Sequence, residues 1–402
     1  MRSTGGGIRT EVTRTGRSLR RRRSARRGPG VWLSAIGGAS VVAGLCLASP
    51  AAAGALGWST QPEPVSWGPG GVSCVVGSAC VLVGGRSGPT RNGLTAAALW
   101  NGTRWVEQRT PTPAGGGSLG AVSCSSRTAC VAIGSGAHSL AERWNGRHWS
   151  LLPAPYRHHG TLGAVSCTSV SACTAVGSAN VNEPLQDVGV LEERWNGRSW
   201  AVQTAPSPDW ALRTLFNSVS CVSPALCTAV GISVARADPQ PTRLLVERWD
   251  GRRWTIAHAP VPGGSLDDST LNSVACTSST ACTAVGDVDG AALVEHWNGR
   301  RWSVQRTPYE VQAPLTGVSC VSATVCEAVG TANQDAGGSS APPTGLVAER
   351  WNGRRWSLQS VPQPAPIGES SWFRAVACAS ARSCFALGGD SGIGAAVFER
   401  YS

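Results

Sequence analysis

The strongest constraint on this chain is a set of cysteines that fall into seven pairs of the form C-x5-C. Successive pairs lie about 51 residues apart, a period typical of propellers and solenoids. The pairs are Cys74/Cys80, Cys124/Cys130, Cys167/Cys173, Cys221/Cys227, Cys276/Cys282, Cys320/Cys326 and Cys378/Cys384. The spacing therefore predicts seven copies of one small structural unit.

Each repeat is expected to contain four short strands, A to D. Runs such as GAVSC and CTAVG supply A and B, and the segment E-R-W-N-G-R-x-W supplies C and D. Asn-Gly favours a two-residue type I′ turn, because both positions accept a positive φ. In the second repeat this turn would pair Trp144 with Arg147 and Glu142 with Trp149. The tryptophans would then fill the space between neighbouring sheets.

The two ends of the chain carry complementary parts of one repeat. The seventh repeat stops at FERYS (398–402), with Tyr401 where other repeats have their first Trp and with no strand D. The segment GWSTQPEP (57–64) is similar to strand D of the other repeats. We therefore expect an all-β, seven-bladed β-propeller with four antiparallel strands per blade, its ring closed by an N-terminal strand in the C-terminal blade. An open solenoid is the alternative.

The first 53 residues have the organisation of a secretory signal. A basic n-region covers 1–30, an apolar h-region covers 31–49, and cleavage is expected after Ala53, which leaves 54–402 as a single propeller domain. An uncleaved signal anchor is the alternative. Residues 1–53 hold ten Arg and one Glu, so the remainder has 25 Arg against 23 acidic residues. The basic charge thus belongs to the leader, and we expect no nucleic-acid partner.

The fourteen repeat cysteines are predicted to form seven disulfides, one within each repeat. Export would place them in a compartment where disulfides persist, and every one has a mate. Each closed loop would stabilise the fold by about 2 kcal/mol. A zinc site is the alternative, but C-x5-C is wider than usual zinc spacing and no His lies in register. Pairing between repeats stays open at this point.

The units VSC…CTAVG…ERWNGRRWS resemble the WNGxxW repeat of secreted actinobacterial proteins, a group placed with kelch-like and galactose-oxidase-like propellers. The segment EHWNG (295–299) is the most similar, and the resemblance covers about 57–402. It implies a secreted propeller but no particular activity. Galactose oxidase needs a copper site with Tyr and His ligands and a Cys–Tyr cross-link. Only three Tyr exist here and every repeat Cys has a mate, so we expect no such site.

Candidate ligand-binding residues come from the connections that vary in length. The A–B and C–D connections are nearly constant, whereas the B–C and D–A connections vary, and varied loops on a rigid scaffold commonly bind ligands. The aromatic residues of the D–A connections are predicted to contact a ligand: Trp67, Trp210, Trp372, Tyr156 and Tyr309. The alternative is that these rings fill gaps between loops and blades.

No motif points to catalysis. H-E-x-x-H, G-x-S-x-G and P-loop patterns are absent from the sequence. A Glu recurs in six repeats, which indicates a structural ion pair or hydrogen bond, because an active site needs such a group once. Asp287 and Asp289 fit a B–C turn better than a calcium site. We therefore expect no catalytic residue, no metal and no cofactor, and we do not expect an enzyme.

The sequence favours a binding or scaffold module, secreted or attached to the cell envelope. Its partner would be an extracellular glycan or protein, and we expect a monomer with no membrane insertion after signal cleavage. The alternative is a secreted carbohydrate-active hydrolase or lyase with paired carboxylates at the propeller funnel. A purely structural spacer or wall component is a third hypothesis.

Overall fold

The structure is a computed structural model. It describes residues 56–402 except 63–64, 76, 78, 90–91, 137, 154, 156–159, 183–186, 237–240, 263–267, 309–312, 333–344, 364–370 and 391–395. By its contacts the chain divides into Met1–Gly54 and Ala55–Ser402. The predicted signal at 1–53 thus lies outside the described residues. Within the described part we find no helix that could span a membrane.

The described residues form 28 strands, four for each sequence repeat. The strands nearest the centre are β2 (Gly68–Val75), β6 (Gly117–Ser126), β10 (Gly160–Ser169), β14 (Ala211–Ser223), β18 (Ser269–Ser278), β22 (Leu315–Ser322) and β26 (Ser371–Ser380). The second strands are β3 (Ala79–Arg86), β7 (Ala129–Gly136), β11 (Ala172–Asn182), β15 (Leu226–Ala235), β19 (Ala281–Val288), β23 (Val325–Ala332) and β27 (Ser383–Asp390).

The remaining strands lie further from the centre. The third strands are β4 (Leu94–Trp100), β8 (Ser139–Trp144), β12 (Asp187–Trp195), β16 (Thr242–Trp249), β20 (Ala291–Trp297), β24 (Gly345–Trp351) and β28 (Ala396–Tyr401). The outer strands are β5 (Trp105–Gln108), β9 (Trp149–Leu151), β13 (Trp200–Gln203), β17 (Trp254–Ile256), β21 (Trp302–Gln305), β25 (Trp356–Gln359) and β1 (Trp58–Thr60).

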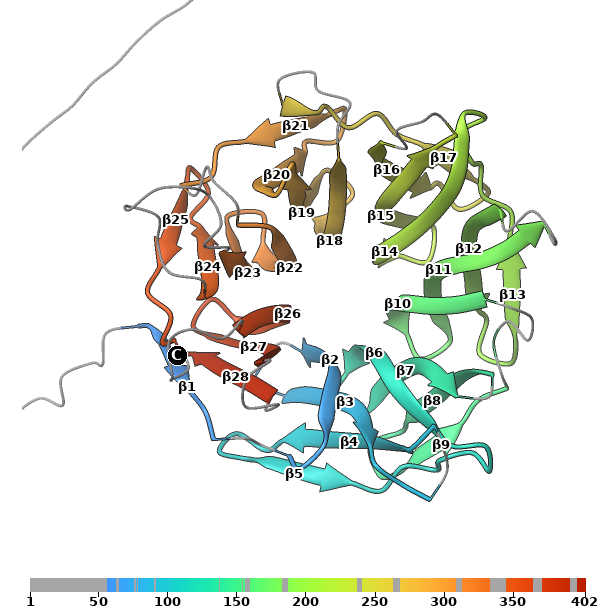
Figure 1. Ribbon diagram of the computed structural model, residues 1–402. Coiled ribbons are helices and arrows are strands. Elements are labelled where there is room, and N and C mark those ends of the chain that lie inside the picture. Colours follow the sequence, from blue (N-terminus) through green and yellow to red (C-terminus); the bar gives the residue numbers. More distant parts are fainter. Residues whose placement is uncertain are drawn as a thin grey trace, which may run out of the picture. The chain divides into compact units, whose positions relative to one another are not determined.

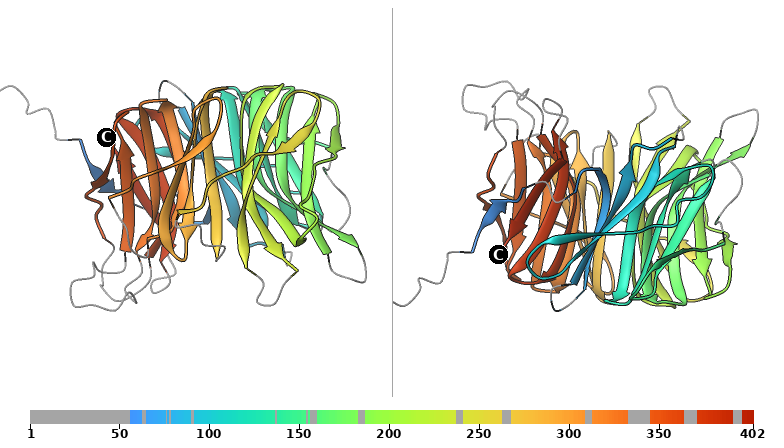
Figure 2. Two further views of the ribbon diagram at one scale, coloured as in Figure 1. Left: turned by 90° about the horizontal axis from the view of Figure 1, so that it is seen from above. Right: turned by 90° about the horizontal axis from the view of Figure 1, so that it is seen from below.

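The strands form five four-stranded sheets and one eight-stranded sheet. The larger sheet joins β10–β13 to β14–β17 through a single parallel pair, Val188 with Arg213, and every other described pairing is antiparallel. The sheets radiate from a common axis (Figure 1), and their long strands run along it (Figure 2). This is the arrangement of a β-propeller. Successive inner strands pack against one another, and β26 also packs against β2.

All seven disulfides form within their own repeats, as predicted. In each repeat the two cysteines stand directly opposite on the first and second strands, for example Cys167 and Cys173 on β10 and β11. Their Cα atoms are 4.0 Å apart. Because the cysteines occupy one cross-strand position, each bridge ties the innermost hairpin of its sheet together.

The disulfides belong to the core and are not an accessible site. The first cysteine of each pair is partly buried. The second cysteine is almost fully buried, at 1–3% exposed, and lies in a hydrophobic cluster; these residues are Cys80, Cys130, Cys173, Cys227, Cys282, Cys326 and Cys384. A buried cysteine in a disulfide presents no reactive thiolate to metal or ligand. The predicted disulfide residues therefore stabilise the fold and take no part in ligand binding.

The predicted two-residue turn between strands C and D is wrong. In the second repeat Trp144 pairs with Trp149 and Glu142 with Leu151, so the loop contains four residues. The Asn145 side-chain oxygen accepts the backbone N–H groups of Arg147 and His148, at 2.9 and 3.0 Å. Gly146 has a φ of 91°, which glycine adopts at no steric cost. The asparagine side chain therefore closes a longer loop and sets the two tryptophans side by side.

The Trp pairs fill the space between neighbouring sheets, as predicted. The Trp144 and Trp149 ring centroids lie 5.8 Å apart. Both rings belong to one hydrophobic cluster with Val81 and Val83 of the preceding repeat. Equivalent pairs stand in the first, third, fourth, fifth and sixth repeats, where the segment reads A-L-W-N-G, E-R-W-N-G, E-R-W-D-G, E-H-W-N-G and E-R-W-N-G. Each sheet thus buries its indoles against its neighbour rather than within itself.

The N-terminal segment pairs with the C-terminal strand, which confirms the predicted pairing of these two segments. Strand β1 runs antiparallel to β28, with Trp58 opposite Tyr401. The two ring centroids are 5.7 Å apart, a spacing similar to that of the Trp pairs elsewhere. Thr60 donates a hydrogen bond of 2.8 Å to Glu399. Residues from the two ends of the sequence therefore complete one four-stranded sheet.

A hydrogen bond from the V-S-C motif links successive inner strands. The Ser166 hydroxyl accepts the backbone N–H of Cys221 in the next repeat at 2.9 Å. In five repeats a serine directly precedes the first cysteine, and each of these serines accepts the same hydrogen bond from the first cysteine of the next repeat. The pairs are Ser73 and Cys124, Ser123 and Cys167, Ser166 and Cys221, Ser220 and Cys276, and Ser319 and Cys378. The other two repeats have Ala275 and Ala377 there. The serine thus explains a sequence motif by a contact between sheets.

We predict that Ser166→Ala lowers the free energy of unfolding by about 1–2 kcal/mol, because the Cys221 N–H loses its partner in a partly buried interface. Ala275→Ser should instead leave stability unchanged or raise it by up to about 1 kcal/mol, since it supplies the missing acceptor. Urea unfolding with the disulfides intact measures both. Equal stability of Ser166→Ala and the wild type would contradict the proposed importance of this bond.

Candidate functional site

Two of the predicted ligand-binding aromatics present exposed rings. Trp210 and Trp372 are 39% and 41% exposed, and both lie at the start of an inner strand. The Arg243 guanidinium lies over the Trp210 ring, 4.6 Å from its centroid. A Cβ on Gly389 would come within 2.7 Å of the Trp372 ring, so this indole lies close against the glycine backbone. Both rings are therefore held in place while part of each stays accessible.

Trp67 does not match the prediction, because the structure buries it. It is only 6% exposed and packs with Val65 and Leu82 in the hydrophobic core. Its indole N–H donates to the Glu107 carboxylate at 3.0 Å. Trp67 therefore fills a gap beside its blade, as the alternative interpretation held, and offers no ring to a ligand. Tyr156 and Tyr309 lie outside the described residues.

A β-bulge in every inner strand turns one residue toward the axis. The register between the first two strands of each repeat shifts by one residue four positions before the first cysteine. A bulge leaves its extra residue unpaired and can re-aim its side chain. The bulged residues are Gly70, Gly120, Gly163, Asn217, Asn272, Thr316 and Arg374.

These seven residues line one cavity of about 240 Å³ between the inner strands, which we call the central channel. Its remaining lining comes from the residues next to the bulges, among them Val72, Ala121, Ser218, Ser273 and Ala375. The bulge residues on one side of the lining are therefore the glycines of the first three repeats. The other side carries polar side chains from the last four.

Hydrogen bonds to the next repeat hold three of the polar side chains. The Asn217 amide donates to the Leu271 carbonyl at 3.0 Å. Asn272 donates to the Leu315 carbonyl at 2.9 Å, and Thr316 to the Phe373 carbonyl at 2.7 Å. Each bond runs from the bulge of one repeat to the residue before the bulge of the next. These side chains are therefore fixed parts of the channel wall.

Arg374 differs from its equivalents because it carries a charge. It is exposed, and it is the one charged side chain that lines the channel among the described residues. No hydrogen bond or ion pair of its guanidinium is found within the described part of the chain. A guanidinium presents several N–H donors in a planar fork that matches carboxylate and phosphate groups. The channel is thus chemically suited to an anionic group.

The alternative of a carboxylate-based hydrolase gains no support at this cavity. No Asp, Glu, His or Cys side chain lines the central channel among the residues that the structure describes. In the described part of the chain, no group of three or more such residues could hold a metal ion. Asp287 and Asp289 are therefore not part of a metal site among these residues. Glycoside hydrolysis needs two carboxyl groups facing one substrate, and the described lining of the channel includes no carboxyl group.

The recurring Glu residues lie between the sheets rather than in the channel. Glu142, Glu193, Glu247, Glu295, Glu349 and Glu399 are all fully or almost fully buried. In five repeats an exposed aliphatic residue stands opposite on the outer strand, for example Leu151 beside Glu142. In the seventh repeat Thr60 takes that place and donates to Glu399. The predicted hydrogen bond is therefore confirmed for Glu399. What all six recurring Glu residues share is a buried position between sheets.

Burial shifts the ionisation of these groups. It raises the pKa of Glu295 to about 8 and that of Glu399 to about 7, although Thr60 opposes the shift of Glu399. Burial also raises the pKa of Glu192 to about 8. Burial and then the charge of Glu192 raise the pKa of Glu247 to about 9. Shifted carboxyls often mark active sites, but Glu247, Glu295 and Glu399 recur between sheets and so indicate the environment of the interface. Glu192 does not recur, and its carboxyl lies close enough to Glu247 to affect that group.

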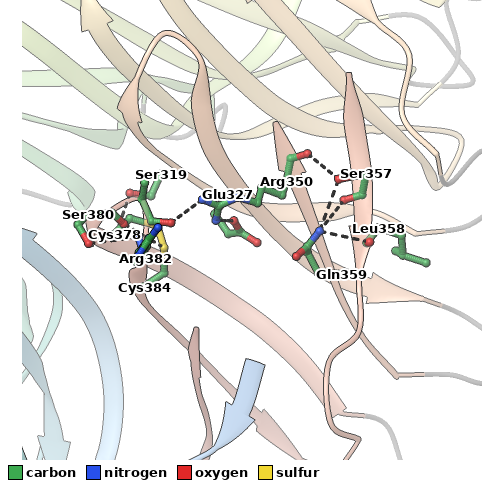
Figure 3. Close-up of polar contacts among 11 residues, drawn as sticks. Ser319, Glu327, Arg350, Ser357, Leu358, Gln359, Cys378, Ser380, Arg382 and Cys384 are labelled. Carbon is green, nitrogen blue, oxygen red and sulfur yellow. Dashed lines mark hydrogen bonds and ion pairs between the residues drawn. A yellow bond between two sulfur atoms is a disulfide. The ribbon is translucent and has the colours of Figure 1, made fainter. Parts of the chain in front are cut away.

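Glu327 forms a buried ion pair at the sheet completed by β1. Arg350 donates to its carboxylate at 2.9 Å, and the Arg350 guanidinium also lies 4.8 Å from the Tyr401 ring centroid. Figure 3 shows this pair beside the disulfide of Cys378 and Cys384 in the next repeat. Burial raises the pKa of Glu327, and the Arg350 charge opposes that shift. The pair therefore belongs to the contact between two sheets.

Sequence reasoning missed the channel residues, although a signal for them exists. The three residues up to the first cysteine read V-S-C or V-A-C in every repeat. The residue four before that cysteine changes from Gly to Asn, Thr and Arg. A variable position beside a constant motif indicates a position freed from packing. A strand is recognised in a sequence by the alternation of apolar and polar residues, and a bulge cannot be recognised in that alternation. The direction of these side chains could therefore not be predicted.

Comparisons with known proteins identify the fold. No protein-family model matches the chain, and no curated protein matches its sequence. A structure described as YCF48 bound to D1 peptide matches with a TM-score of 0.54 and 13% identity, over 88% of this chain and 99% of that one. YCF48 from Cyanidioschyzon merolae matches with a TM-score of 0.54 and 12% identity, over 86% and 98%.

The WD40 β-propeller domain of Doa1 matches equally well, with a TM-score of 0.54 and 12% identity over 85% of this chain and 97% of that one. Identities this low show the fold alone. The described residues therefore form an all-β structure with a β-propeller fold. The radial arrangement of the sheets supports the same conclusion independently of the comparisons.

We predict that the protein loses stability as the pH rises from about 5 to 9. The buried Glu residues have raised pKa values in the folded state. Their preference for the proton in the folded state adds fully to the free energy of unfolding below the ordinary pKa near 4.5. This contribution is lost as the pH passes the folded values of about 7–9. Each Glu protonated only in the folded state contributes a slope of about 1.4 kcal/mol per pH unit.

Urea unfolding of the wild type and of Glu295→Gln across this pH range measures the effect. Glu295→Gln should have a shallower pH dependence, because the amide cannot ionise. Asp209→Asn, which changes an exposed carboxylate, is the matched control and should keep the wild-type slope. A slope that is the same in Glu295→Gln and the wild type would count against this explanation.

Proposed function

We propose that residues 54–402 form one seven-bladed β-propeller whose ring is closed by β1 and β28. Three contacts between distant parts of the sequence support this proposal. Strand β1 pairs with β28, β26 packs against β2, and the Arg400 guanidinium lies 5.2 Å from the Trp100 ring centroid. The Arg400 contact repeats one seen between consecutive repeats, such as Arg194 over Trp249. A closed ring leaves no terminal sheet face exposed to water.

Removal of residues 54–61 is expected to destabilise the whole domain, because it takes Trp58 out of the core and leaves β28 unpaired. Loss of a buried Trp alone typically costs about 3–5 kcal/mol. A synthetic peptide of residues 54–62 added in trans should restore part of the loss in thermal scans. A truncated chain that unfolds at the wild-type temperature would argue for an open array.

We propose that this propeller is a protein-binding module that works in an oxidising compartment, either secreted or attached to the cell envelope. Seven disulfides support such a compartment. Among its structural neighbours, the YCF48 structure contains a bound D1 peptide, so a propeller of this general form can hold a peptide. We further propose that the chain belongs with the secreted actinobacterial WNGxxW-repeat proteins.

The observation that carries the binding proposal is the pair of exposed indoles at the starts of inner strands. Trp210 precedes β14 and Trp372 lies in β26, so both stand at the end of the sheets where the D–A connections enter. Tryptophan is enriched at the centres of protein interfaces because it buries a large area at low entropic cost. We place the partner on this face, over the mouth of the central channel.

We predict that Trp210→Ala with Trp372→Ala weakens partner binding at least tenfold without lowering the melting temperature, because both rings are exposed. The purified domain would first be screened against a phage-displayed library of random linear peptides and against a glycan array. Binding of each hit would then be measured by interferometry. Hits on the glycan array alone would favour a glycan partner in place of a protein.

The matched control is Val202→Ala with Leu358→Ala, which removes exposed apolar side chains from outer strands β13 and β25. This control should bind like the wild type. Equal affinities of the tryptophan double variant and the wild type would contradict the proposed binding face.

A further inference from the structure

We propose that the central channel is a recognition subsite for one carboxylate group of the bound peptide, and that Arg374 is the residue that holds it. This inference rests on the proposed function as a peptide-binding module. It adds the chemical class that the module selects: an Asp or Glu side chain, or a C-terminal carboxylate. The Arg374 guanidinium would donate two parallel hydrogen bonds to the carboxylate oxygens.

The first argument is the composition of the bulge positions. One lining residue in each repeat is aimed by the same backbone bulge, so the seven residues form a comparable set. Asn217, Asn272 and Thr316 use their donors on carbonyls of the next repeat. Arg374 makes no such bond within the described residues. Its donors are therefore available, while the equivalent groups serve the fold.

The second argument is the charge around the channel. No acidic residue lines it in the described chain, so nothing in the wall neutralises Arg374. Asp287 on β19 accepts a hydrogen bond from the channel residue Asn272 and is close enough to Asp268 and Asp289 to interact with their charges. All three belong to the fifth repeat, whereas Arg374 belongs to the seventh. An anion in the channel would therefore bind on the Arg374 side.

The third argument is the space opposite Arg374. A Cβ on Gly120 would meet no heavy atom within 4 Å, and one on Gly163 would meet only the Phe216 carbonyl at 4.0 Å. A volume of about 240 Å³ suits a single side chain or a chain end rather than a folded segment. By contrast, a Cβ on Gly70 would lie 2.3 Å from the Leu119 carbonyl, so that glycine is required by packing.

The fourth argument connects the channel to the proposed binding face. Trp372 lies two residues before Arg374 in the same strand, β26, and its indole is exposed. A peptide that stacks on Trp372 would therefore be positioned to place one acidic side chain in the channel. The aromatic ring would supply contact area, and the guanidinium would supply selectivity for charge.

The experiment uses the purified domain and the peptides selected from the random library. Selected sequences should be enriched in Asp or Glu at one position. In fluorescence anisotropy, exchange of that Glu for Gln in the labelled peptide should raise Kd at least tenfold for the wild type. For Arg374→Gln the two peptides should bind with the same Kd. Arg374→Lys should recover part of the preference, since it keeps the charge and loses the planar fork.

Two further variants test whether binding of the Glu side chain needs open space in the channel, and whether the loss of any exposed Arg would have the same effect. Gly120→Leu places an aliphatic side chain in the channel and leaves the Arg374 charge in the protein; it should abolish the preference for Glu while the melting temperature stays unchanged, since a Cβ on Gly120 meets open space. Arg300→Gln removes an exposed Arg from a C–D turn at the opposite end of the sheets and should bind like the wild type.

The outcomes distinguish this inference from the proposed function. Selected peptides that lack acidic residues, depend on Trp372 and bind equally well with a free or an amidated C-terminus would support the binding module and overturn the carboxylate subsite. A loss of affinity on amidation alone would identify the chain end as the bound carboxylate. A preference for Glu that survives in Arg374→Gln would also overturn it. A library that yields no binder at all would count against both the module and the subsite.

Discussion

Burial of both faces of each sheet by its neighbours is the constraint on which the structure depends. A four-stranded sheet of this length cannot cover its own tryptophans, and the core is divided into clusters that each combine residues of adjacent repeats. Stability therefore arises between repeats as much as within them. The disulfides act differently, because each one stays inside its own hairpin and limits the freedom of the unfolded chain.

Directional contacts set how neighbouring sheets align. The Ser166 hydroxyl accepts a backbone N–H from the next inner strand, near the axis. Further out, the Arg248 guanidinium lies 4.0 Å from the centroid of Trp297 in the next repeat and donates to the Ser279 carbonyl. Together they explain why the V-S-C and E-R-W motifs recur. In the E-R-W motif the Arg side chain lies on one face of the sheet, and the Glu and Trp on either side of it lie on the other face. The Arg side chain can therefore reach the following repeat.

The same repetition produces a site that is not repeated. Every inner strand carries a bulge at the same position, so seven residues face the axis under a common geometry, three of them glycines. Packing requires a glycine at Gly70 but leaves the equivalent position open elsewhere, so that position can be Gly120 in one repeat and Arg374 in another. The scaffold thus supplies rigidity through its constant residues, while the bulge position supplies chemistry. The exposed rings of Trp210 and Trp372 add contact area at the ends of two inner strands.

The sequence by itself determined the number of repeats, the four strands of each and the pairing of the Trp58 segment with Tyr401, and it predicted the disulfide partners while leaving pairing between repeats open. These features depend on spacing, alternation and local turn chemistry, which a sequence displays directly. Tertiary structure alone decided that Asn145 closes a four-residue loop, that Trp67 is buried against Glu107, and that Arg374 points into a channel. Each of those outcomes depends on which atoms approach from another strand or another repeat, and a linear pattern carries no record of that approach.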